Sequence, residues 1–171
     1  MNSSELDEKY MKAALDEAEA ALFAGEFPVG CVIAGPHGIA ASGGRSFSRG
    51  PGANEIDHAE IAALRNLCDS GFEGDRAGLS LYCTMEPCLM CFGAAVISKI
   101  RRIVYAYEDV MGGGTSCSLE NLPPLYKNQE IRIIGNVMRE QSLDLFYRFF
   151  SDPENTYLQG TLLAEYTLCR K

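Results

Sequence analysis

Apolar residues recur along the chain at two spacings, and each spacing predicts a different kind of element. From position 5 to position 24 the apolar side chains return every three or four residues, which is typical of an amphipathic helix. Later segments repeat this spacing or open with a helix start signal, such as Pro87 before an apolar run. The further predicted helices are 58–70, 87–98, 118–122, 139–150 and 160–168.

Short apolar runs between turn residues predict strands. The first two runs are joined by Gly35-Pro36-His37-Gly38, whose turn chemistry predicts a hairpin. The predicted strands are 29–34, 39–43, 79–84, 102–107 and 131–134. The segment 44–56 is polar and contains glycine, so we expect a loop there.

The order of these elements predicts the fold class. Strands alternate with helices after the hairpin, and helical crossovers join parallel strands, whereas a hairpin joins antiparallel ones. We therefore predict an α/β fold, a three-layer α/β/α sandwich around a five-stranded mixed sheet. A site is expected in the loops at the carboxyl ends of the parallel strands.

Length and composition set limits on the class of protein. A chain of 171 residues predicts one domain over 1–171, with a core at about 5–151 and a C-terminal extension over 152–171. With 47% hydrophobic and 22% charged residues, a disordered chain is excluded. The net charge of −8 repels phosphate backbones, so nucleic acid is not the expected partner.

The N-terminal segment and the cysteines point to a reducing compartment. The first ten residues are acidic and lack the basic and apolar regions of a signal peptide. The longest strongly apolar stretch, 92–97, is too short to cross a bilayer, so no membrane contact is expected. We predict a cytoplasmic location, where the seven cysteines serve as ligands or buried apolar groups rather than in disulfides.

Two short motifs carry the candidate chemistry. His58 opens one predicted helix, and Cys88 and Cys91 lie three apart in the first turn of the next, so both sulfurs point the same way. The amino end of a helix also stabilises thiolates. The predicted strand 79–84 lies between the motifs and brings both helix starts to one edge of the sheet. Imidazole and thiolate are preferred zinc ligands, so we predict one Zn²⁺ per chain, held by these three residues.

Three protein ligands leave one coordination position for water, which is the arrangement of a catalytic zinc. Glu60 lies two residues after His58 and points partly round the helix, so it is better placed to hold this water than to bind the metal. We expect Glu60 to act as general base and then as general acid. A separate C-x-x-C is as often a redox or buried pair, and a fully liganded structural zinc remains an alternative.

Together these residues resemble a known family. H-x-E followed about 30 residues later by P-C-x-x-C is similar to the signature of zinc deaminases that act on nucleobases. The chain resembles the cytidine and deoxycytidylate deaminase superfamily, nearest to the branch of bacterial tRNA adenosine deaminase, guanine deaminase and fungal cytosine deaminase. The resemblance spans about 10–150 and includes the segments 25–30, 81–88 and 149–150.

The resemblance implies a cytidine deaminase-like fold and a hydrolytic reaction. Water activated at the zinc would replace an amino group on a heterocycle, and Glu60 would move protons to the ring nitrogen and the departing ammonia. It further implies that Val29 and Gly30 line the base pocket and that backbone near Glu86 holds the leaving amine. Ordinary core and turn roles are the alternatives for these three. Dimers are common among similar proteins, so a homodimer is expected.

The chain departs from the family pattern before His58. An asparagine that often follows the second strand is replaced in the alignment by Arg45, although a shifted loop brings Asn54 to the same role. Arg45 would pair with a substrate carbonyl or phosphate, with a solvated loop arginine as the alternative. For Asp57, which directly precedes His58, we favour helix capping over orientation of the histidine or substrate contact.

The substrate class follows from the charges. The segment after Phe150 is acidic, whereas enzymes that bind tRNA tend to place Lys and Arg around the pocket and on the final helix. We therefore predict a nucleobase, nucleoside or similar small amino-heterocycle as substrate. The alternative is tRNA-specific adenosine-to-inosine deamination. A non-catalytic zinc-binding interaction module is less favoured, because Glu60 would have no purpose in it.

Overall fold

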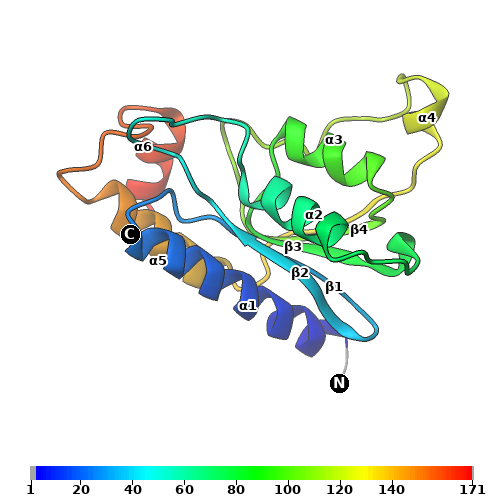
Figure 1. Ribbon diagram of the computed structural model, residues 1–171. Coiled ribbons are helices and arrows are strands. Elements are labelled where there is room, and N and C mark those ends of the chain that lie inside the picture. Colours follow the sequence, from blue (N-terminus) through cyan, green and yellow to red (C-terminus); the bar gives the residue numbers. More distant parts are fainter. Residues whose placement is uncertain (1–2, 171) are drawn as a thin grey trace.

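The centre of the computed structural model, which describes residues 3–170, is a five-stranded sheet (Figure 1). Its strands are β1 (Gly30–Gly35), β2 (Gly38–Gly44), β3 (Ser80–Met85), β4 (Arg102–Tyr107) and β5 (Arg132–Ile134), in the order β2-β1-β3-β4-β5. β1 is antiparallel to both of its neighbours, whereas β3, β4 and β5 are parallel. The predicted mixed sheet is confirmed.

Helices cover both faces of the sheet. They are α1 (Ser3–Phe23), α2 (Ala59–Asp69), α3 (Leu89–Ile97), α4 (Pro124–Lys127), α5 (Arg139–Phe150) and α6 (Leu162–Leu168), with a 3₁₀ turn, η1 (Arg76–Gly78). Figure 1 shows α1 and α5 side by side on one face and α2 and α3 on the other. The three-layer α/β/α prediction is therefore confirmed.

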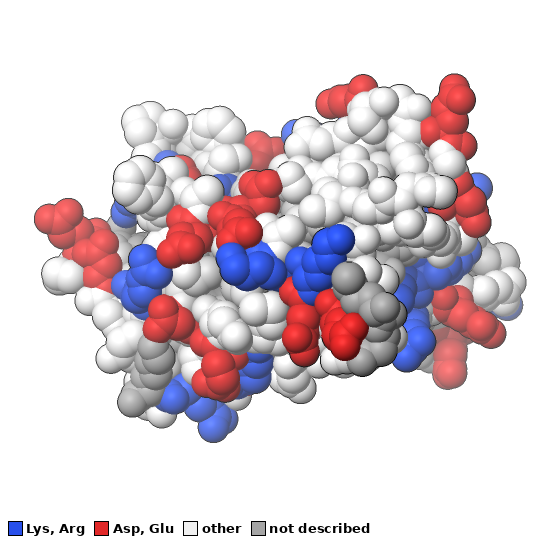
Figure 2. All heavy atoms as spheres, turned by 90° about the horizontal axis from the view of Figure 1, so that it is seen from below, with Lys and Arg blue, Asp and Glu red and all other residues white. Residues whose placement is uncertain are grey.

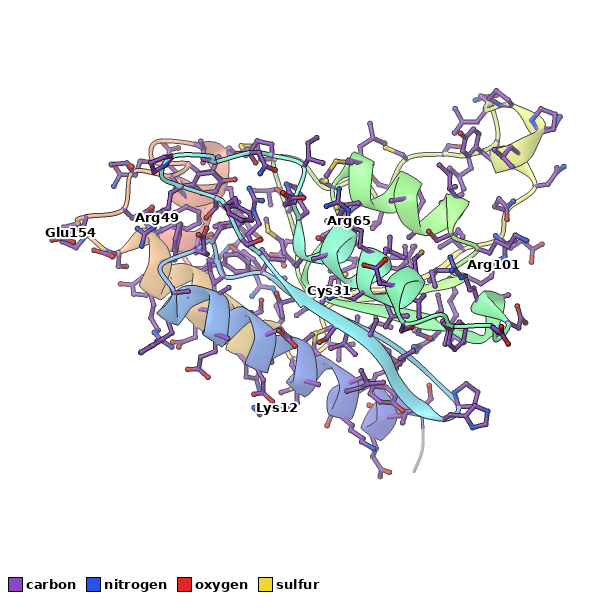
Figure 3. The ribbon with its side chains drawn as sticks, in the orientation of Figure 1. Lys12, Cys31, Arg49, Arg65, Arg101 and Glu154 are labelled. Atoms are coloured by element: carbon purple, nitrogen blue, oxygen red, sulfur yellow. The ribbon has the colours of Figure 1, made fainter. Side chains whose placement is uncertain are left out.

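Alternate side chains of the strands supply the two halves of the core, as the period of a strand requires. One set packs against α1: Val32, Ala34, Tyr82, Val104 and Ala106. The other set packs beneath α2 and α3: Cys31, Ile33, Leu81, Cys83 and Ile103. Cys31, labelled in Figure 3, belongs to this second set and is fully buried.

One glycine lets α1 lie directly on the sheet. A Cβ at Gly30 would come within 2.1 Å of the carbonyl oxygen of Ala14 in α1. The Gly30 amide instead donates to the hydroxyl of Thr84 on β3, at 3.0 Å. Because Gly30 has no side chain, α1 can pack directly against the start of β1.

The predicted helix over 118–122 is wrong, because the two prolines begin a helix instead of ending one. Pro123 is the extended N-cap residue of α4, with ψ of 160°, and Pro124 is its first helical residue. Proline suits that position because its missing N–H would have no helical partner there. No helix within residues 3–170 is both long enough and apolar enough to span a membrane.

The extension after α5 folds back onto the body of the molecule. α6 lies against α5, and the hydroxyl groups of Thr167 and Tyr107 are 3.0 Å apart in the interior. Arg139, at the start of α5, donates to the Glu108 carboxylate at 2.5 and 2.8 Å, and the Tyr166 hydroxyl donates to the same carboxylate at 2.6 Å. These contacts fix the C-terminal segment at the carboxyl end of β4.

Candidate active site

The site is built where two helices begin. His58 is the N-cap residue of α2 and Cys88 is the N-cap residue of α3, and both have extended backbone. Neither side chain caps its own helix, so the imidazole and the thiol are available to a ligand. β3 ends at Met85, three residues before Cys88, which places the start of α3 at the carboxyl edge of the parallel strands.

His58, Cys88 and Cys91 converge on one point. The Nδ1 atom of His58 lies 3.5 Å from the sulfur of Cys88 and 3.5 Å from the sulfur of Cys91. All three ligand atoms lie within 4.8 Å of one another. Tetrahedral zinc with its usual bond lengths holds N and S ligands about 3.5 Å apart, so these residues fit one zinc ion.

Negative charge in this group is favoured on Cys88. A hydrogen bond from Cys91 lowers the pKa of Cys88 to about 4, and His58 adds to the effect while burial opposes it. The same bond raises the pKa of Cys91, and hydrogen bonding to Cys88 raises the pKa of His58. The site thus places a Cys88 thiolate beside two groups that keep their protons to higher pH than usual.

Glu60 lies beside the three ligands without joining them. It is in the first turn of α2 and only 3% exposed. Burial raises the pKa of Glu60, whereas His58 and Cys91 act against this rise. A buried carboxyl group with a raised pKa next to a metal group has the properties of a proton carrier.

A cavity of about 210 Å³ opens beside these groups. His58, Glu60 and Cys88 form part of its wall, together with Val29, Arg45, Glu86 and residues from three loops. The other lining residues are Phe27, Glu55, Ala59, Met85, Asp109, Met111, Gly112, Tyr157, Leu158 and Leu163. This volume is below the roughly 300–1,000 Å³ of pockets for drug-sized ligands, which suits a ligand of one or two rings.

Two of the predicted substrate contacts lie outside the cavity lining. Gly30 faces α1, as described above. Asn54 forms a turn in which its Oδ1 atom accepts from the amides of Ile56 and Asp57, each at 2.9 Å. Glu86, which does line the cavity, accepts hydrogen bonds from the hydroxyl of Thr115 and from the amide of Asp109 at 3.3 Å.

Two interpretations of the loop before His58 are wrong. Arg45 is not a solvated loop residue, because it is only 4% exposed and donates to the carbonyl groups of the loop. Asp57 does not cap α2, because the N-cap is His58 and the Asp57 carboxylate accepts from Arg65 and Asn54, both at 3.1 Å. Arg65, labelled in Figure 3, belongs to α2, so this pair fixes the loop to the helix.

Some functional candidates have no signal in the sequence. Tyr157, Leu158 and Leu163 come from the C-terminal extension, which the structure folds against the cavity. Glu55 also lines it, and its Oε2 atom lies 3.8 Å from Nε2 of His58.

The remaining cysteines were expected in the core, but only Cys31 and Cys83 are buried, whereas Cys68, Cys117 and Cys169 are exposed.

The glycine loop after β4 lies against the start of α3. The amide of Gly114 donates to the Pro87 carbonyl at 2.8 Å, and a Cβ on Gly114 would be 2.6 Å from the Leu89 nitrogen. Only a residue without a side chain fits this approach, which brings Asp109 and Met111 into the cavity wall.

Comparison with known proteins decides the family. Residues 4–107 match the model of the cytidine and deoxycytidylate deaminase zinc-binding region. The chain belongs to this family. It is therefore a zinc-binding deaminase that acts hydrolytically on a nucleobase or nucleoside, rather than a non-catalytic zinc module.

Relatives of this deaminase include enzymes named for tRNA. The chain is 31% identical over 153 residues to the tRNA-specific adenosine deaminase of Bacillus subtilis (strain 168), covering 85% of this chain and 89% of that protein. A solved structure from a study of A-to-I editing by tRNA:A34 deaminases has a TM-score of 0.67 and 29% identity, covering 80% of this chain and 98% of that one.

A more distant structure shares the fold alone. The guanine deaminase from Nitrosomonas europaea has a TM-score of 0.67 and 21% identity, with 83% of each chain covered. Its fold agrees with that of this deaminase, and at this identity its substrate does not transfer. The fold is thus common to enzymes with different named substrates.

Proposed function

We propose that this deaminase acts on a small amino-heterocycle, either a free nucleobase or a nucleoside, and releases ammonia. The observation that carries the proposal is the small cavity, whose wall includes three residues of the C-terminal extension. A side wall supplied by Tyr157, Leu158 and Leu163 leaves room for a base beside His58 and Glu60.

In the proposed reaction the substrate carbon that carries the amino group gains the oxygen of water and loses ammonia. His58, Cys88 and Cys91 would hold zinc, which would supply an activated water at neutral pH. The Glu60 carboxylate would accept one proton of this water and donate it to the ring nitrogen, and would then pass the second proton of the same water to the departing amine. Burial of Glu60 keeps these transfers within the cavity rather than with bulk solvent.

Apolar and acidic side chains share the rest of the wall. Phe27, Val29 and Met85 offer apolar surface to a ring, and backbone near Glu86 is positioned beside the leaving amine in this proposal. The carboxylates of Glu55, Glu86 and Asp109 favour N–H donors over phosphate oxygens. Arg45 is occupied by backbone carbonyls, so we assign it to positioning of the loop, and Asn54 and Gly30 act through the packing described above.

Adenosine in tRNA is the second candidate substrate. Sequence similarity supports it more directly than a small substrate, because relatives at 31% and 32% identity carry tRNA in their names. The net charge of −8 speaks against it, because it repels phosphate backbones. On the face in Figure 2, acidic and basic side chains are interspersed. The turn after α5 carries Asp152 and Glu154, the latter at the outer tip of this segment in Figure 3.

Two assays on the same zinc-loaded preparation separate the candidates. One measures ammonia release from guanine, adenine, cytosine and their nucleosides. The other measures inosine by mass spectrometry in a tRNA anticodon stem-loop. Ammonia from a base or nucleoside with no inosine in the stem-loop is the expected result. Inosine without ammonia release from the small substrates would establish the tRNA candidate instead.

We also propose a homodimer that uses the outer face of α2 and α3. Leu89 and Ile97 are 63% and 60% exposed there, and Ile61 and Ala94 lie in the shallow groove between the helices. Light scattering on wild type and Ile97→Glu tests this, with a dimer expected only for wild type.

A cytoplasmic location stays a prediction, supported by seven free cysteines and tested by cell fractionation.

A further inference from the structure

A cluster of three polar side chains joins distant parts of the chain at the cavity wall. Glu55 lies in the loop before α2, Arg45 follows β2 and Tyr157 belongs to the C-terminal extension. The Tyr157 hydroxyl donates to Oε2 of Glu55 at 2.9 Å, and Nη2 of Arg45 lies 3.4 Å from the same oxygen. One carboxylate therefore connects the extension with the loop that carries His58.

Arg45 makes the loop end of this connection rigid. Its Nη1 atom donates to the carbonyl groups of Ser46 and Asp57 at 2.9 and 2.8 Å, and Nη2 donates to the carbonyl of Asn54 at 2.7 Å. The side chain is 2% exposed. A buried guanidinium that leaves these acceptors would lose several charge-assisted hydrogen bonds at once, so the loop around Glu55 is held in place.

Tyr157 is fixed at both ends of its side chain and by its backbone. Its ring centroid lies 5.3 Å from that of Phe27 and 6.4 Å from that of Phe149. Asn155, which is 1% exposed, accepts from the Tyr157 amide at 2.9 Å and donates to its carbonyl at 3.2 Å. The phenol thus stands in the cavity wall beside Phe27 with little freedom to move.

We propose that Tyr157, positioned by Glu55, sets the size of the cavity and makes the deaminase select a free base over its nucleoside. This inference rests on the proposed function. The phenol lies close to the zinc group, because the Glu55 oxygen that it contacts is also 3.8 Å from Nε2 of His58. A ribose attached to a bound base would therefore compete with the Tyr157 side chain for space in the cavity. Glu55 acts here as a positioning residue, because it holds the phenol in the wall.

The first test compares Tyr157→Phe with Tyr82→Phe. Both variants remove a tyrosine hydroxyl that donates to a carboxylate, but Tyr82 bonds to Asp7 of α1 and does not line the cavity. Without its bond to Glu55 the ring is held less firmly in the wall, so we expect Tyr157→Phe to raise KM for the best base about ten-fold, with the change in KM rather than in kcat. Tyr82→Phe should keep the wild-type KM. Equal KM changes in both variants would show a merely structural role and overturn the inference.

The second test measures selectivity. In Tyr157→Ala the ratio of kcat/KM for nucleoside to kcat/KM for base should rise at least ten-fold, because the wall is opened. Glu55→Ala should move the ratio in the same direction, and Glu55→Gln, whose amide oxygen still accepts from the phenol, should restore it in part. An active wild type with an unchanged ratio in Tyr157→Ala overturns this inference alone. A wild type that releases no ammonia from any base or nucleoside overturns the proposed function as well.

Discussion

Burying a carboxyl group beside two sulfurs and an imidazole lowers the stability of the folded protein, because the group loses its contacts with water. Glu60 loses most of its hydration, and burial raises its pKa accordingly. Glu60 lines the cavity beside the zinc-binding group. Proton transfer at the cavity is the role that accounts for its position.

Replacing this carboxyl group separates metal binding from turnover. In Glu60→Ala we expect one zinc per chain, because the three ligands are unchanged, and a fall in ammonia release of about 10²–10⁴-fold. Metal analysis and an ammonia assay on the same sample check this. Glu73→Ala, which removes an exposed carboxylate, is the control and should keep full activity. Wild-type turnover in Glu60→Ala would remove Glu60 from the mechanism.

The zinc ligands predict how metal affinity depends on pH. Zinc binds thiolate and neutral imidazole, so protons on these groups must leave when it binds. The raised pKa values of Cys91 and His58 mean that both hold their protons to higher pH than usual. Apparent zinc affinity, measured by chelator competition, should therefore rise from pH 6 to pH 8. An affinity independent of pH over this range would contradict the charge distribution described here.

At the scale of elements, local patterns in the sequence were enough to predict the metal group. His58 and Cys88 each directly precede a helix, and the spacing of Cys88 and Cys91 requires no knowledge of the tertiary structure. The contact between Glu55 and Tyr157 joins residues 102 positions apart, so no local pattern indicates it. For Arg45 the sequence predicts a substrate contact, with a solvated loop arginine as the alternative, whereas the loop turns its own carbonyl groups onto the guanidinium.

The junction between the glycine loop and α3 gives a prediction at this scale. Gly114→Ala places a methyl group 2.6 Å from the Leu89 nitrogen, so either the loop or the start of α3 must shift. We expect a loss of about 1–3 kcal/mol in the free energy of unfolding, together with weaker zinc binding, because Cys88 is at this junction. Urea denaturation and chelator competition measure the two effects.

Gly93→Ala is the matched control for this variant. Gly93 lies inside α3, and a Cβ there meets no atom within 4 Å. Alanine is also the better helix former, so this variant should be neutral or stabilised by about 0.5–1 kcal/mol. A Gly114→Ala protein as stable and as zinc-bound as Gly93→Ala would show that the loop does not position α3.

For the whole molecule, the position of the C-terminal extension depends on a polar junction as well as on apolar packing. Glu108 after β4, Arg139 in α5 and Tyr166 in α6 meet at one carboxylate. The Arg139 guanidinium also lies over the Tyr107 ring, 5.2 Å from its centroid. Tyr157, Leu158 and Leu163 lie between Arg139 and Tyr166 in the chain. The contacts of this junction therefore stabilise the cavity wall together with the fold.

The Glu108 junction should make the stability of the protein depend on pH in a defined direction. Burial opposes the charge on Glu108, but hydrogen bonds from Arg139 and Tyr166 outweigh it and lower the pKa of Glu108 from 4.5 to about 2. A carboxylate with a lowered folded-state pKa stabilises the fold fully above its unfolded-state pKa, and this contribution is lost as the pH falls towards the folded-state value.

Wild type should therefore exceed Glu108→Gln by about 1–2 kcal/mol in free energy of unfolding at pH 7, and the difference should shrink between about pH 4.5 and pH 2. Glu140→Gln removes the other carboxylate paired with Arg139, which is 77% exposed, and should change stability by less than about 0.5 kcal/mol at any of these pH values. Urea denaturation of the three proteins at pH 7, 4 and 3 measures this, and a difference for Glu108→Gln that grows as the pH falls would reverse the assigned sign.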